Sequence, residues 1–100
     1  MQAKPQSIQI ESIQVERDPS EERLNELGVR HWPTWSKAPS EFPWLYDDSE
    51  TCYFLSGDVE VTPDDGETVR VGQGDLVTFP AGMSCRWRIL QSVKKHYSFG

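Results

Sequence analysis

The sequence has few of the features that mark several large classes of protein. Only two of its 100 residues are cysteine, which is too few for a disulfide scaffold, and they form no zinc-binding spacing with the histidines. No apolar run approaches the ~18 residues of a membrane helix, and the first residues lack the apolar core of a secretory signal. We therefore expect a cytoplasmic protein with no membrane partner.

Basic residues are also scarce, with 10 Lys and Arg against 16 Asp and Glu and a formal net charge of −6. Between residues 41 and 75 the only base is Arg70, whereas residues 76–100 contain bases and no acid. A nucleic-acid backbone requires clustered bases, so we expect no nucleic-acid partner. The segregation of charge favours strands of opposite charge lying side by side, and an anion site is the alternative.

The composition that remains is that of one folded domain. Hydrophobic residues make up 36% of the chain and aromatic residues 11%, which is too many for a disordered chain. A chain of this length can bury one core without a metal or disulfide framework. We expect a single domain over residues 1–100.

Residues 7–28 predict a strand followed by a short helix. Apolar residues alternate from Ile8 to Val15, with a change of parity near Glu11 that a bulge would explain. In the following segment Asp18 is the expected N-cap, Pro19 suits the first helical position, and Glu21 completes a capping box. Gly28 should end the helix after two to three turns.

The remainder of the chain predicts β-structure after an irregular segment. Three prolines within residues 29–48 argue against a helix or a long strand there. From Thr51 onward, short β-rich runs alternate with glycine-containing turns, so a sandwich or a barrel is expected. The predicted breaks lie at Gly57, at residues 64–66, 72–75 and 80–82, and between SCRWRIL and KKHYSFG.

Two segments resemble the conserved motifs of the cupin superfamily. The first motif, G-x5-H-x-H-x(3–4)-E-x6-G, matches at Glu50 and Gly57. The second, G-x5-P-x-G-x2-H-x3-N, matches at Gly74, Pro80 and Gly82. The chain is most similar to small single-domain cupins of the ureidoglycine aminohydrolase-like group. This resemblance implies an all-β fold, namely a single cupin double-stranded β-helix (a jelly-roll barrel) with one short N-terminal α-helix. It places the core barrel at about residues 42–99.

The resemblance also implies where a metal would be bound. Metal-binding cupins use three histidines and one glutamate. Here Glu50 is retained, but Trp44 and Tyr46 stand at the histidine positions of the first motif and Cys85 at that of the second. An indole has no lone pair to give, and phenolate, thiolate and carboxylate would form an unusual ligand set. We therefore predict no metal and no other cofactor.

The same alignment predicts a narrow aromatic pocket inside the barrel. Period-two alternation places one face of each motif strand toward the interior, where an acid, a thiol and several rings would meet. The catalytic candidates are Glu50, Tyr46, Cys85 and His96, and the ligand-binding candidates are Trp44, Cys52, Phe54 and Trp87.

Each candidate also has a purely structural interpretation. Glu50 could be a buried fold determinant bonded to the backbone or to Tyr46, and Cys85 could be a small core residue. The aromatic rings could simply fill the core. His96 could be a strand histidine bonded to the backbone, and a disulfide between Cys52 and Cys85 is geometrically open.

Three functions are compatible with these residues. The first is a cupin that binds or transforms a small polar metabolite, and the resemblance implies nitrogen-rich compounds such as ureides. The second is a metal-free module that senses a ligand. The third is a structural domain whose interior is only core. Cupins commonly pair through sheet edges, so we expect a homodimer. The sequence leaves open whether the protein is an enzyme.

Overall fold

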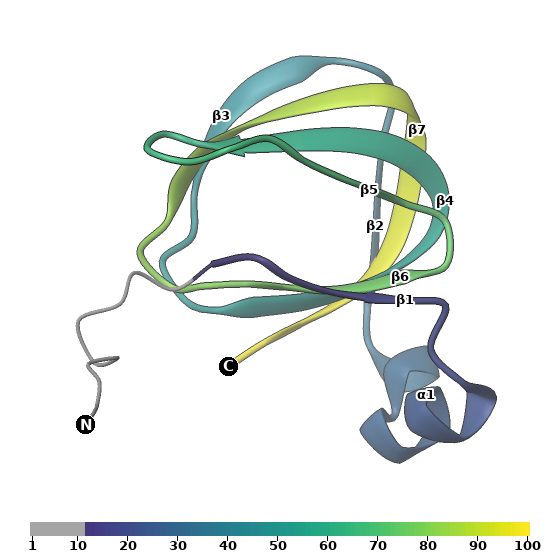
Figure 1. The fold of residues 1–100 in the computed structure, drawn as a ribbon. Coiled ribbons are helices and arrows are strands. Elements are labelled where there is room, and N and C mark those ends of the chain that lie inside the picture. Colours follow the sequence, from purple (N-terminus) through teal and green to yellow (C-terminus); the bar gives the residue numbers. More distant parts are fainter. Residues whose placement is uncertain (1–11) are drawn as a thin grey trace, which may run out of the picture.

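Two long strands form the spine of the protein in a computed structural model, which describes residues 12–100. β4 (Glu50–Pro63) and β7 (Ser84–Phe99) pair antiparallel along nearly their whole lengths. Both were expected as two shorter strands, and this expectation is wrong. Gly57 lies within β4, and residues 91–93 continue β7, so each strand bends through an irregular pairing instead of ending. The curvature of these two strands is visible in Figure 1.

The shorter strands pair with different halves of the spine. β6 pairs with the first half of β4 and β5 with its second half, while β3 and β2 pair with the first and second halves of β7. β1 pairs with β6. The strands then form the all-β jelly roll that was predicted (Figure 1). The ranges are β1 Gln14–Arg17, β2 Thr34–Lys37, β3 Glu41–Leu45, β5 Val69–Gly72 and β6 Asp75–Phe79.

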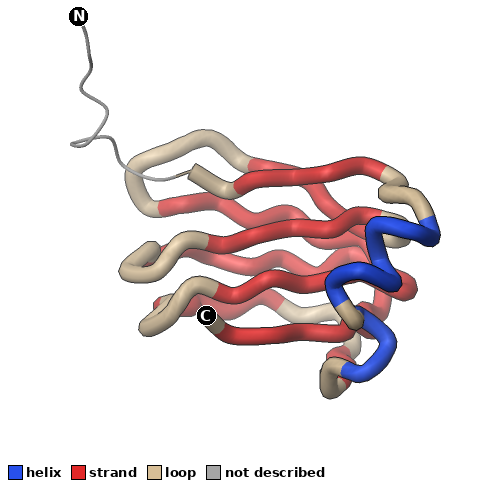
Figure 2. The backbone as a smooth tube through the Cα atoms, turned by 90° about the horizontal axis from the view of Figure 1, so that it is seen from below, coloured by secondary structure: helices blue, strands red, loops and turns tan. Residues whose placement is uncertain are grey.

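Helix α1 (Glu21–Leu27) lies at one end of the strand layers (Figure 2). The hydroxyl of Ser20 accepts a hydrogen bond from the backbone N–H of Arg23, so Ser20 is the N-cap, and the assignment of that role to Asp18 is wrong. Asp18 instead has a φ of 51° and donates its backbone N–H to the carbonyl of Gly74. The predicted end at Gly28 is confirmed, because this glycine has left-handed φ and ψ angles.

The proline-rich segment contains more regular structure than its composition predicts. A short 3₁₀ helix (Val29–His31) precedes β2, and β3 follows it. Pro43 is tolerated in β3 because this strand pairs only with β7 in the described chain, so a missing N–H on its other edge breaks no ladder. The prediction of an irregular segment is therefore wrong for β2 and β3. The predicted strand at residues 7–11 lies outside the described residues.

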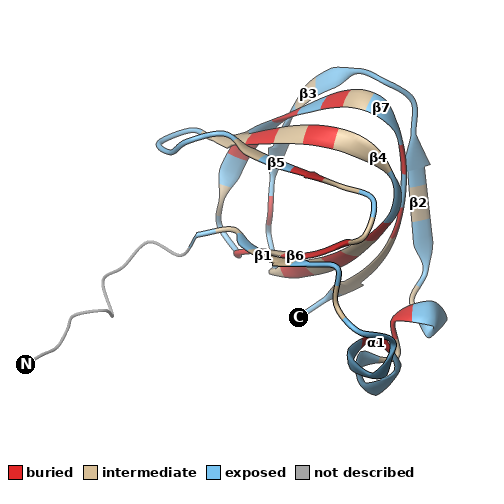
Figure 3. Ribbon diagram, turned by 45° about the vertical axis from the view of Figure 1, so that its right-hand side comes forward, coloured by how far each residue is buried: buried red, intermediate tan, exposed pale blue. Residues whose placement is uncertain are grey.

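Alternation along the spine builds the interior. Buried residues alternate with intermediate ones along the first part of β4 and with exposed ones along the first part of β7, as the bands in Figure 3 show. Glu50, Cys52 and Phe54 are buried before the bend, and Val59 and Val61 are buried after it. The irregular pairing between residues 54 and 59 thus changes which parity faces inward, so that both halves of β4 contribute to one core.

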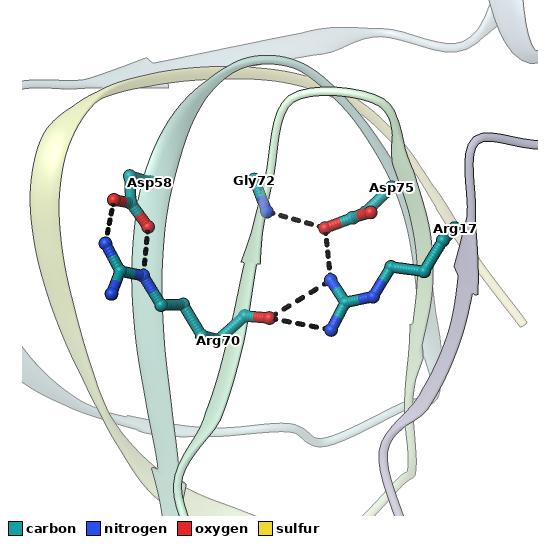
Figure 4. A network of polar contacts seen from close by, with 5 residues as sticks. All are labelled: Arg17, Asp58, Arg70, Gly72 and Asp75. Carbon is teal, nitrogen blue, oxygen red and sulfur yellow. Dashed lines mark hydrogen bonds and ion pairs between the residues drawn. The ribbon is translucent and has the colours of Figure 1, made fainter.

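A polar network fastens β1 to the turn between β5 and β6 (Figure 4). Asp75 accepts hydrogen bonds from the guanidinium of Arg17 at 2.7 Å and from the backbone N–H of Gly72 at 2.8 Å. The same guanidinium donates to the carbonyl of Arg70. The first strand is therefore held by side-chain contacts as well as by its ladder with β6.

Candidate functional site

A pocket of about 220 Å³ opens beside the buried carboxylate of Glu50. Its lining comes from β2, β3, β4 and β7 and from Tyr46 in the loop before β4. Most of the lining is aromatic, with one acid and one base among the rings. The lining residues are Trp35, Phe42, Trp44, Tyr46, Glu50, Trp87, Lys95, Tyr97 and Phe99.

Glu50, Cys52 and Lys95 form a closed triangle of polar contacts at the wall of this pocket. The Nζ of Lys95 lies 2.8 Å from Oε2 of Glu50 and 3.0 Å from Sγ of Cys52. Sγ of Cys52 in turn lies 3.3 Å from the same Oε2. The Lys95 and Glu50 side chains are only 6% and 7% exposed. Transferring such charged side chains from water to the interior costs free energy, and each charge compensates part of that cost for the other.

Aromatic rings surround this triangle. The rings of Trp35, Trp87 and Tyr97 have their centroids 5.1, 5.5 and 5.6 Å from Nζ of Lys95. At such distances the negative faces of the rings attract the ammonium. Tyr46 completes the wall, because its ring stacks on Phe79 at 4.9 Å and its hydroxyl accepts a hydrogen bond from Nε1 of Trp87.

The protonation states follow from burial and neighbouring charge. Burial raises the pKa of the Cys52 thiol to about 12, and its hydrogen bond to Glu50 acts in the same direction. Burial likewise raises the pKa of the Cys85 thiol to about 11 and that of Tyr46 well above its usual range. For Lys95, burial lowers the pKa, but Cys52 and Glu50 outweigh it and the pKa is raised. At neutral pH the site thus combines neutral thiols and a neutral phenol with a charged ammonium.

The structure brings together most, but not all, of the predicted site residues. Trp44, Tyr46, Glu50 and Trp87 line the pocket, with Trp44 half exposed at its edge. Cys52 is not part of the lining, but it contacts Glu50 and Lys95 in the triangle. Phe54 and Cys85 are buried in the core and are not part of the lining. Both cysteines are free, so the disulfide alternative is wrong.

His96 lies apart from the pocket. It neighbours Lys95 on β7 but points to the other face, where Nδ1 lies 2.9 Å from the carbonyl oxygen of Trp32. Because a carbonyl oxygen only accepts, Nδ1 carries the proton in this contact. The geometry matches the structural interpretation of a strand histidine bonded to the backbone.

Lys95 is the functional residue that sequence reasoning missed. KKHYSFG was predicted as a strand, but lysine is rarely buried, and Lys95 was not among the candidates. The signal was nevertheless present, since Lys95 has the same parity as the apolar Val93 and Tyr97 and as Trp87 earlier in β7. Trp35 and Phe42 were missed for a different reason, because their segment was not predicted to form strands.

The residues at the metal-ligand positions do not fit a metal ion. Trp44 offers an indole, and the hydroxyl of Tyr46 is neutral and already accepts from Trp87. Oε2 of Glu50 is occupied by the ammonium of Lys95. Within residues 12–100, no three His, Cys, Asp or Glu side chains cluster so as to hold a metal ion. We therefore derive no chemistry through a metal.

The barrel, its motif turns and its inward-facing strands define a cupin, as the resemblance implied. The model of the EutQ-like cupin domain matches residues 24–97, and the chain belongs to this family. No curated protein matches it. In the described residues no helix is long and apolar enough to cross a membrane.

Solved structures agree with this assignment. A DUF861-family protein of Thermotoga maritima is 50% identical, with a TM-score of 0.86 over 89% of this chain and 100% of that one. A Salmonella typhimurium protein named for ethanolamine utilization, EutQ, is 27% identical, with a TM-score of 0.60 over 66% of this chain and 53% of that one. EutQ of Clostridium difficile, at 20% identity, is similar in fold, with a TM-score of 0.60 over 66% of this chain and 52% of that one. The chain thus spans about half the length of both EutQ proteins.

Proposed function

We propose that the protein binds a small polar metabolite in the aromatic pocket. The observation that carries this proposal is the buried pair of Glu50 and Lys95 within the lining of a pocket otherwise made of rings. Ligand pockets are typically apolar walls with a few polar groups that fix orientation. At about 220 Å³ the pocket is smaller than the ~300 Å³ at which most drug-sized sites begin, so its ligand is a small compound.

Binding is favoured over covalent catalysis by the protonation states of the site. A thiol is nucleophilic as its thiolate, but the pKa of Cys52 is raised to about 12 and that of Cys85 to about 11. Lys95 remains an ammonium, which is neither a nucleophile nor a base. Of the catalytic candidates this leaves Glu50, whose carboxylate could accept a proton from a bound ligand. Metal-free sensing is thus the first function that we propose, and proton-transfer catalysis by Glu50 is the alternative.

A ligand screen by thermal unfolding tests the proposal. The panel contains ureides, which the family resemblance suggests, together with ethanolamine, which the name of the Salmonella protein suggests, and small hydroxy acids. A ligand selective for the folded state at 100 times its Kd stabilises by about 2.7 kcal/mol. Failure of every compound to shift the Tm would count against the pocket.

Two variants on the same strand localise any binding. Trp44→Ala removes a half-exposed ring that lines the pocket, whereas Leu45→Ala removes a similarly exposed side chain that does not. We expect Trp44→Ala to weaken the ligand-induced shift and Leu45→Ala to leave it unchanged. Equal shifts in both variants would place the ligand elsewhere. Ammonia release or another turnover that Glu50→Gln abolishes would instead favour the enzymatic alternative.

Self-association is a second proposal, favoured by the order of the strands. β1 and β2 end the main path of the sheet, so within residues 12–100 each has one edge without a partner strand. Such edges are available for pairing with another chain. Light scattering at micromolar concentration is expected to give twice the monomer mass, and a monomer mass would overturn this proposal.

A further inference from the structure

The surroundings of Lys95 have the composition of a cation site. A carboxylate oxygen, a sulfur atom and ring faces all approach one nitrogen, and each of these groups attracts positive charge. The carboxylate is that of Glu50, at 2.8 Å, and the sulfur is that of Cys52, at 3.0 Å. The rings are those of Trp35 on β2 and of Trp87 and Tyr97 on β7.

The cation site lies at the position where the resemblance places the metal of other cupins. Glu50 is the carboxylate that the resemblance places at the metal-ligand position of the first cupin motif. The other ligand positions hold Trp44, Tyr46 and Cys85, which do not fit a metal, yet the carboxylate has been kept. A carboxylate buried in this way without a counter-ion would be strongly unfavourable. Its counter-ion here is Lys95, which lies in the part of β7 that follows the second motif.

We infer that Lys95 serves as the built-in cation of the barrel, taking the place of a metal ion beside Glu50 and presenting its ammonium to the ligand. This inference deepens the proposed function, because it names the chemistry by which the pocket recognises its ligand. An ammonium has three N–H groups, and among the described residues Glu50 and Cys52 accept two of them. The third is available to an acceptor oxygen of the ligand, carried by a carbonyl or a carboxylate group.

Chemical rescue tests the role of Lys95 without any metabolite. Lys95→Ala removes a group equivalent to n-propylammonium from a buried, ring-lined space. Propylammonium chloride is expected to raise the Tm of Lys95→Ala by several degrees in a saturable manner. 1-Propanol has nearly the same shape without the charge and should have a much smaller effect. Lys94→Ala, which alters an exposed neighbour, should not respond to propylammonium at all.

A substitution that invites a metal provides the second test, and it remains available if Lys95→Ala does not fold. Lys95→His places an imidazole beside Glu50 and Cys52, and these three groups are metal ligands. We expect one Co²⁺ per chain to bind Lys95→His with a rise in Tm and a thiolate-to-cobalt absorption band. The wild-type protein should show neither change.

Two results would overturn the inference. One is stoichiometric binding of Co²⁺ or Mn²⁺ to the wild-type protein that Glu50→Gln abolishes, since the metal would then be the cation of the site. The other is folded Lys95→Ala that propylammonium and propanol stabilise equally. Neither readout uses a metabolite, so a failed metabolite screen would count against the proposed function and leave the role of Lys95 standing.

Discussion

At the residue scale, the site depends on how charge is held inside a small barrel. Glu50 and Lys95 lie on different strands, and the register that pairs Phe54 with Lys95 and Cys52 with Tyr97 brings them together. Breaking a buried ion pair on one side leaves an uncompensated charge and costs about 3–5 kcal/mol, whereas replacing both partners costs much less. The pair is therefore a strong constraint on which substitutions this barrel accepts.

A double-mutant series measures this constraint. Lys95→Met is expected to lower the free energy of unfolding by about 3–5 kcal/mol, because it leaves the Glu50 carboxylate buried and unpaired. Adding Glu50→Gln should restore part of the loss, since the unpaired charge is then gone. Urea denaturation of the wild type, of each single variant and of the double variant gives the four free energies that are compared. Additive losses in the double variant would mean that the two side chains do not act as a pair.

The buried thiol predicts a loss of stability in alkali. Cys52 has a pKa of about 12 in the folded protein, against about 8.5 in an unfolded chain. Its contribution is therefore complete below about pH 8.5 and is lost as the pH rises toward 12, by up to about 1.4 kcal/mol per pH unit. Unfolding free energies measured from pH 8 upward should fall less steeply for Cys52→Ser than for the wild type. Parallel curves would contradict the raised pKa.

Sequence reasoning predicted the acid of this site and missed its base. Glu50 and Cys52 were placed inward by alternation from a recognisable motif. The inward direction of Lys95 could be inferred from its parity, but its place beside Glu50 required the register between β4 and β7, which no local pattern encodes. The buried ion pair of Glu50 and Lys95 thus depends on the long-range pairing of β4 with β7.

At the scale of the strands, the bend in β4 depends on the absence of a side chain. Gly57 has a φ of 114°, and a Cβ added to it would lie 2.7 Å from Cα of Val93 on β7. We expect Gly57→Ala to be less stable than Gly74→Ala by about 1–3 kcal/mol, because Gly74 also has a positive φ but faces open space. Thermal unfolding of the two variants makes the comparison, and equal losses would refute the close contact.

The polar network that fastens β1 to the turn between β5 and β6 gives a second prediction at this scale. Asp75 is buried and accepts from both the Gly72 backbone and Arg17, so Asp75→Ala leaves a backbone N–H unsatisfied. A loss of about 1–3 kcal/mol is expected. Glu67→Ala, an exposed acid in the β4–β5 connection, should change stability by less than about 0.5 kcal/mol. A similar loss in both variants would show that the network adds nothing to β1.

The strands themselves were predicted to different degrees. The turns at residues 64–66, 72–75 and 80–82 were recognised because their glycines and prolines act locally. β2 and β3 were not recognised, because the prolines in their segment disfavour a strand locally. Both strands form nonetheless, because their backbones pair with β7. Gly57 was likewise interpreted as a break, because glycine weakens a strand locally. In the structure, however, β4 and β7 remain paired on both sides of it.

At the scale of the whole molecule, the segregated charges of the sequence meet in the fold, as expected. Glu60 lies directly opposite Arg88, with an ion pair at 3.5 Å. Two further ion pairs join Glu41 of β3 to β7 and Asp58 of β4 to β5. Exposed pairs of this kind contribute little to stability and are screened by salt. The Tm should therefore fall by only a few degrees between low and high NaCl concentration. A large fall would indicate stronger electrostatic stabilisation than the exposed pairs provide.

The sharing of β4 and β7 between both halves of the barrel has a consequence for how the protein opens. Neither half is expected to detach as a separate foldon, because β4 and β7 each run without interruption from one half into the other. Amide protons before and after Gly57 in β4 should therefore exchange with deuterium through one common event, with equal protection free energies. The short outer strands, by contrast, can fray individually and should exchange first.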